Sequence, residues 1–390
     1  MYRLLFIFCL YLLIKNAEGS KLQINFYDAN LNFTIEFYKA VMYQNPNVNF
    51  LISPIAAQLS LGLAHFGAKG NTAEELSPQL QKFTNQDLKH LYSSVSSRFK
   101  SKSGYKFDLV NTFFISKKYR ISKEYLEWAK NPFGSLVQPI NFEKVKTTVR
   151  NINTWVRQNT DHKVNNILTA TDIDEKTTAL LLNALYFQGY WLRQFDPKKT
   201  QRMSFYKNCE ETALVDMMIA KDTFNYYADD ELGAQFLEIP FKGHSVSMTI
   251  VLPRTKFGLH NLEARIADVL VPKNYEEDIV DVMIPKFRIG YKLNMKSTLL
   301  AMNVHTPFQC TADFSGISTS SPPLHLNEVI QKTYVEINEK GATNAKAFSY
   351  GALSPRSKGT SFVANYPFLY YFKHKVSGIF FIGRYLFPEK

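Results

Sequence analysis

The order of helical and strand-like patterns is the sequence feature that most limits the fold of this chain. Apolar residues recur at helical spacing in several segments between residues 32 and 159, and strand-like runs are few there. From Arg202 onward short apolar or alternating runs predominate, at 236–240, 246–252, 281–284, 368–371 and 379–382. No regular strand–helix–strand alternation occurs. The sequence therefore predicts an α+β fold.

Three local patterns predict individual elements. Ser53 and Pro54 suit the cap and first turn of a helix that is apolar on nearly all sides, which predicts a buried central helix. Thr72 and Glu75 have the spacing of a capping box at the start of the next helix. Residues 178–186 contain three consecutive leucines and predict a strand that is buried on both faces.

The first nineteen residues are typical of a secretory signal peptide. Arg3 precedes a short apolar stretch, and small residues end it at Gly19. No later run reaches the length of a transmembrane helix. We therefore expect a secreted, extracellular protein without a transmembrane segment, cleaved after Gly19.

The net charge of +12 leaves the partner open. The basic residues are scattered, with small clusters at Lys117-Lys118-Arg120 and at Lys198-Lys199. Solvated surface charge is the favoured interpretation, and weak binding to acidic glycans is the alternative. Basic residues beside aromatic ones at 370–375 fit a strand end better than a nucleic-acid site, so no nucleic acid is expected.

Few residues point to covalent chemistry. Cys209 and Cys310 are too few for a disulfide framework, and whether they pair is open. Asn32 begins the only glycosylation sequon, in a predicted helix, so its occupancy is open. The chain lacks the short motifs of metalloproteases, hydrolases and nucleotide-binding enzymes, and its eight histidines show no ligand spacing. We expect neither an enzyme nor a metal or cofactor.

Residues 339–358 form the most unusual stretch between predicted strands. Small residues dominate it, and so it is predicted to be a long exposed loop. By composition alone a mobile linker is favoured. The bond between Arg356 and Ser357 is one that a trypsin-like protease would cut.

Several blocks of sequence together resemble the serpin family, over essentially all of residues 30–390. These blocks are NFLISP at 49–54 with GAKGNT at 67–72, NTWV at 153–156, NALYFQGYW at 183–191, PKF at 285–287, ADFSG at 312–316 and FVANYPF at 362–368. Phe195, Thr200 and Lys286 belong to the same set of matches. All the blocks occur in the order of the family.

The resemblance implies one serpin domain over residues 20–390, with three β-sheets, eight or nine helices and an exposed reactive loop at about 341–361. It also implies a monomer that inhibits a serine protease without a catalytic group of its own. The protease attacks the loop and forms an acyl-enzyme, and the freed hinge then inserts into the central sheet.

The resemblance also implies roles for single residues. Glu339, Gly341 and Ala342 correspond to the start of the hinge, and Arg356-Ser357 to the bond cut by an Arg-specific, trypsin-like protease. The loop is one residue longer than usual before Arg356. Strict spacing would place the cut after Pro355, and Lys358 is a distant second to Arg356. Ser53, Ala56, Asn183 and Gln331 correspond to the region that controls opening of the sheet.

The hinge departs from the pattern of inhibitory serpins. Inhibitory serpins usually carry a run of Thr, Glu and alanines after the hinge glycine, whereas this run contains Asn344 and Lys346, and both would face the protein interior in an inserted strand. Burial of an unpaired ammonium is costly. Ala56 and Gln331 also replace the usual Ser and His. The alternative function is therefore a non-inhibitory serpin that acts as a binding or carrier protein.

Overall fold

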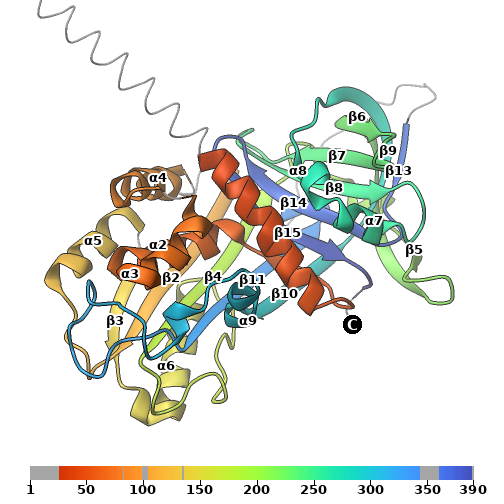
Figure 1. Ribbon diagram of the computed structural model, residues 1–390. Coiled ribbons are helices and arrows are strands. Elements are labelled where there is room, and N and C mark those ends of the chain that lie inside the picture. Colours follow the sequence, from red (N-terminus) through yellow and green to blue (C-terminus); the bar gives the residue numbers. More distant parts are fainter. Residues whose placement is uncertain (1–25, 82, 99–103, 134–135, 343–359, 389–390) are drawn as a thin grey trace, which may run out of the picture.

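The computed structural model describes residues 26–81, 83–98, 104–133, 136–342 and 360–388 of the chain (Figure 1). Nine α-helices lie in this described part. The first spans residues 26–44. The others are α2 (Pro54–Gly67), α3 (Gly70–Leu76), α4 (Asn85–Arg98), α5 (Lys123–Phe133), α6 (Val145–Gln158), α7 (Leu259–Ala264), α8 (Ile266–Leu270) and α9 (Met295–Ala301).

The first of two hydrogen-bonded sheets has the order β10-β11-β12-β4-β2-β3. Its strands are β2 (Tyr105–Ser116), β3 (Leu136–Ile140), β4 (Ala179–Tyr190), β10 (Phe287–Asn294), β11 (Glu328–Asn338) and the two-residue β12 (Gly341–Ala342). β4 is buried on both faces from Ala179 to Phe187, as the run of leucines predicts. We call this six-stranded sheet the central sheet.

The second sheet has the order β1-β15-β14-β8-β7-β6-β9-β13, and β5 pairs with β6 beside this path. Its strands are β1 (Phe50–Ile52), β5 (Gln201–Tyr206), β6 (Thr212–Asp229), β7 (Ala234–Pro240), β8 (Val246–Pro253), β9 (Glu276–Pro285), β13 (Thr360–Val363), β14 (Phe368–His374) and β15 (Gly378–Tyr385). The long β6 divides this second sheet into two smaller sheets, because β5 pairs with the first part of β6 and β7 pairs with its last part. These two smaller sheets and the central sheet are the three sheets of the expected α+β fold, which is confirmed.

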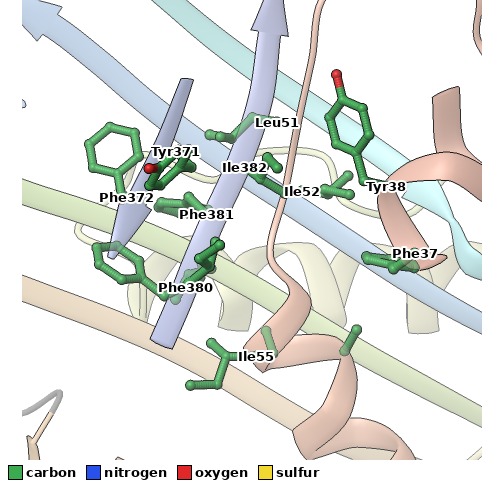
Figure 2. Close-up of a cluster of buried hydrophobic side chains, with 14 of the residues drawn as sticks. Phe37, Tyr38, Leu51, Ile52, Ile55, Tyr371, Phe372, Phe380, Phe381 and Ile382 are labelled. Atoms are coloured by element: carbon green, nitrogen blue, oxygen red, sulfur yellow. The ribbon is translucent and has the colours of Figure 1, made fainter. Parts of the chain in front are cut away.

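The buried helix α2 lies between the sheets and contacts β2, β4 and β15. Its cap is as predicted, since the Ser53 hydroxyl accepts a hydrogen bond from the Ala56 backbone N–H at 3.3 Å. Figure 2 shows the core around its first turn, with apolar side chains from the first helix, β1, α2, β14 and β15. A smaller apolar cluster, which includes Ile152 and Val156 of α6, covers the other face of the central sheet.

The capping box predicted for Thr72 and Glu75 is wrong. The cap of α3 is Lys69, and it makes no side-chain capping hydrogen bond. The Thr72 hydroxyl instead accepts from the Asp313 N–H at 2.8 Å. The Glu75 carboxylate accepts from the backbone N–H groups of His305 and Thr306. Partners distant in sequence therefore outcompete the local bonds that the spacing predicts.

Candidate functional site

β4 and β11 form a fork at one end of the central sheet. Over most of their length they pair directly and in parallel, Glu328–Tyr334 against Leu180–Tyr186. Beyond this stretch β12 lies between them and is antiparallel to both. Ala342 is opposite Ile337 on one side and Gly189 on the other. The predicted start of the hinge therefore already occupies the opening between the two strands.

Gly341 is required by the geometry of the fork. Its φ of +143° lies in a region that residues with a side chain rarely adopt. A Cβ atom at this position would lie 2.0 Å from the carbonyl oxygen of Gly189. Two glycines thus allow the backbone of the hinge to approach β4 closely.

Glu339 anchors the hinge immediately before β12. Its carbonyl oxygen accepts from the Phe195 N–H at 2.8 Å. Its carboxylate accepts from the Thr200 hydroxyl at 2.8 Å and lies 3.1 Å from the Lys286 ammonium. Burial alone would raise the pKa of this carboxyl, but its own backbone N–H, Thr200 and Lys286 together hold the pKa below its ordinary value of 4.5.

Trp191 fixes the turn between β11 and β12 from the side of β4. Its backbone N–H donates to the carbonyl of Lys340 at 2.8 Å, and its indole N–H donates to the carbonyl of Asn338 at 3.0 Å. The ring is fully buried and stacks on Phe241. The turn is therefore held by a rigid, buried side chain.

The four residues predicted to control sheet opening lie together where β4 and β11 of the central sheet meet the start of α2. Gln331 bonds twice to the backbone of Ser53, accepting from its N–H at 2.7 Å and donating to its carbonyl at 2.9 Å. Asn183, the register partner of Gln331, donates to the Ser60 hydroxyl at 2.6 Å and to the Ala56 carbonyl at 3.4 Å. Both strands of the fork are thus tied to α2.

The remaining predicted site residues are separate from the fork. Asn344, Lys346, Arg356, Ser357 and Lys358 lie outside the described residues, as does the predicted signal peptide. Asn32 is exposed on the first helix, whereas Thr34 of the same sequon is fully buried and donates to the Asn30 carbonyl. Cys209 and Cys310 are both exposed and free, so they do not pair.

Sequence reasoning assigned no role to the residues that hold Glu339 and the turn. Thr200, Lys286, Phe195 and Trp191 stand in the blocks that resemble the family, and that resemblance is the signal that could have pointed to them. The structure explains their presence through contacts to residues about 50 to 150 positions away along the chain.

A model of one protein family matches this architecture. It is described as Serpin (serine protease inhibitor) and covers residues 28–388. This chain belongs to the serpin family. The description of the family is that of protease inhibitors and not of proteases. Within the described residues no group of acidic, histidine or cysteine side chains could hold a metal ion, and no helix is long and apolar enough to cross a membrane.

Relatives over the whole domain carry the names of protease inhibitors. Leukocyte elastase inhibitor of Xenopus tropicalis is 31% identical over 378 residues, which cover 93% of this chain and 100% of that protein. Serpin B4 of Homo sapiens is 31% identical, with 93% and 99% covered. Among solved structures, Serpin48 of the insect Tenebrio molitor superposes with a TM-score of 0.87 at 31% identity, over 93% of this chain and 98% of that chain.

Proposed function

We propose that this serpin inhibits a trypsin-like serine protease, which cleaves it after Arg356 and is trapped when the hinge inserts between β4 and β11. The observation that carries the proposal is the pairing of Gly341 and Ala342 with both strands of the fork. Insertion would extend a strand that has already begun. Its energy would come from a new antiparallel strand with partners on both sides.

The register of β12 gives the place of each further residue if the strand continues. Ala342 lies between Ile337 and Gly189, so each later residue moves one step back along both neighbours. Lys346 would then lie between Thr333 and Leu185, and both of these are fully buried on the side of α2. Phe348 would lie between Gln331 and Asn183, the two residues that tie the strands to α2.

This register supports slow insertion as the weak point of the inhibitor. Neither Thr333 nor Leu185 carries a carboxylate that could pair with the Lys346 ammonium. Burial of an unpaired charge costs several kcal/mol. The long stem of lysine reduces this cost where the amine reaches water. The alternative function, a binding or carrier serpin, rests on this cost. One solved neighbour, thyroxine-binding globulin, carries such a role in its name, but at 23% identity that likeness concerns the fold alone.

Incubation of the purified protein with trypsin tests the proposal. We expect an SDS-resistant complex and a released fragment that begins at Ser357. Arg356→Ala should abolish the complex, whereas Lys358→Ala should retain it. Complete cleavage of the wild-type protein with undiminished trypsin activity would overturn the inhibitory function and leave the carrier function.

Three further properties belong to the same proposal. The pattern of residues 1–19 supports secretion. N-terminal sequencing of the protein from culture medium tests it, and the mature chain should begin at Ser20.

The exposed position of Asn32 supports glycosylation. The net charge, +12 for the full sequence and +11 once residues 1–19 with Arg3, Lys15 and Glu18 are removed, supports binding to acidic glycans. The resemblance to the family supports a monomer.

A further inference from the structure

Basic side chains gather at the end of the central sheet that is opposite the hinge. One group follows the last residue of β2, and the other lies where α6 begins. The two groups adjoin, because the Lys117 N–H donates to the Ile140 carbonyl at 2.8 Å and the Lys118 ammonium lies 3.0 Å from the Glu143 carboxylate. We call the exposed cations of this surface the basic pole: Lys117, Lys118, Arg120, Lys144 and Lys146.

Most of the charge of the basic pole is uncompensated. Among the residues that the structure describes, only Lys118 of this group forms an ion pair. Elsewhere on the protein basic side chains are often matched, as Lys273 is by Asp229 and Arg265 is by Asp268. Unmatched cations that gather on a turn and on the adjoining start of a helix produce a local positive potential, which attracts anions.

The surroundings of the basic pole favour a sulfated glycan over other polyanions. The exposed large apolar residues of the described chain include none between 117 and 120 or between 144 and 146, so an apolar anchor for a bilayer is lacking there. Tyr119, the aromatic residue of the turn, is only 6% exposed and offers no face for a nucleic-acid base. A glycan that carries sulfate groups requires only clustered cations.

We propose that the basic pole is the glycan site of this protein and that it holds the protein with the hinge directed away from the glycan. β2 runs from Tyr105, which pairs with Gly189 beside the hinge, to Ser116 at the pole. Twelve extended residues span about 35 Å. Figure 1 likewise places α6 and β13 on opposite sides of the molecule. The inference rests on the glycan binding proposed above and assigns it a place.

Binding to heparin, a sulfated glycan, at several salt concentrations tests this assignment. The variant K117Q/K118Q/R120Q removes three charges from the pole. The matched control K198Q/K199Q/R202Q removes three exposed charges, none with an ion pair in the described structure, beside the hinge. We expect the slope of log affinity against log salt to fall by about two to three units in the first variant, roughly one for each cation lost, and to stay unchanged in the control.

The outcomes separate the site from the function. If wild-type protein does not bind heparin at physiological salt, the proposed glycan binding fails. If both variants lose affinity equally, or only the control does, glycan binding stands and the basic pole is overturned as its site. Binding of the wild type to phosphatidylserine vesicles but not to heparin would replace the glycan by a membrane surface. Thermal unfolding of both variants should match the wild type, because the side chains are exposed.

Discussion

Glu339 connects the hinge to two other parts of the chain, and its effect on stability should depend on pH. Because its pKa is lowered on folding, the carboxylate stabilises the folded protein above its ordinary pKa of 4.5, and this contribution is lost as the pH falls through the lower folded value. We expect Glu339→Gln to lower the free energy of unfolding by about 1–2 kcal/mol at pH 7, since charge-assisted hydrogen bonds to Lys286 and Thr200 are weakened.

Urea denaturation of wild type and Glu339→Gln at pH 7 and at about pH 3.5 measures this difference, which should shrink at the lower pH. Lys286→Gln serves as the matched variant. The double variant should be less destabilised than the sum of the two single ones, because both remove the same interaction. An equal difference at both pH values would show that the ion pair is not the cause.

The reciprocal amide bonds of Gln331 tie an element of the central sheet, β11, to the start of α2. Gln331→Leu would leave the N–H and carbonyl of Ser53 buried without these partners. We expect a loss of about 2–3 kcal/mol in the free energy of unfolding. Gln331→His can keep one of the two bonds and should fall between Leu and the wild type. Urea denaturation at pH 7 measures the series, and equal stability of the Leu variant would contradict the tie.

The elements that the sequence predicts well are those whose signals are local. Ser53 and Pro54 begin α2 as predicted, and the leucines of β4 place a strand on the correct residues. The two-residue β12 has no such signal, because its pairing depends on Asn338, Gly189 and Tyr190, which are brought together only by the fold. The same reason explains the wrong capping box, since Glu75 bonds to residues 230 positions away.

The candidate site was predictable only through resemblance to a family. Nothing in the spacing of Glu339 and Lys286 indicates that they meet. Lys286 lies between β9 and β10, Glu339 follows β11, and β10, α9 and a long connection separate them. The blocks of sequence around these residues indicate the family, and the known hinge of the family indicates the role of Glu339. The contacts of Thr200 and Trp191 then follow from the structure alone.

At the scale of the whole molecule, the proposed insertion implies that the intact protein is not in its most stable arrangement. The parallel pairing of β4 with β11 would be replaced by two antiparallel pairings if the loop entered between them. Antiparallel pairing is slightly more stable per residue, and each inserted residue also adds backbone hydrogen bonds. In the proposed mechanism, a chain cut after Arg356 is free to insert. The cut protein should therefore be more stable than the intact one.

Thermal melting after limited cleavage by trypsin measures this gain. For a chain of this size several kcal/mol correspond to a rise in Tm of roughly 5 °C or more. Lys346→Ala should raise the Tm of the cut form further, because it spares the burial of an ammonium between Thr333 and Leu185, while Lys358→Ala, beyond the cut, should not. If cleavage leaves the Tm unchanged in the wild type and in Lys346→Ala, the loop does not insert, and the two residues of β12 mark the end of the strand and not its beginning.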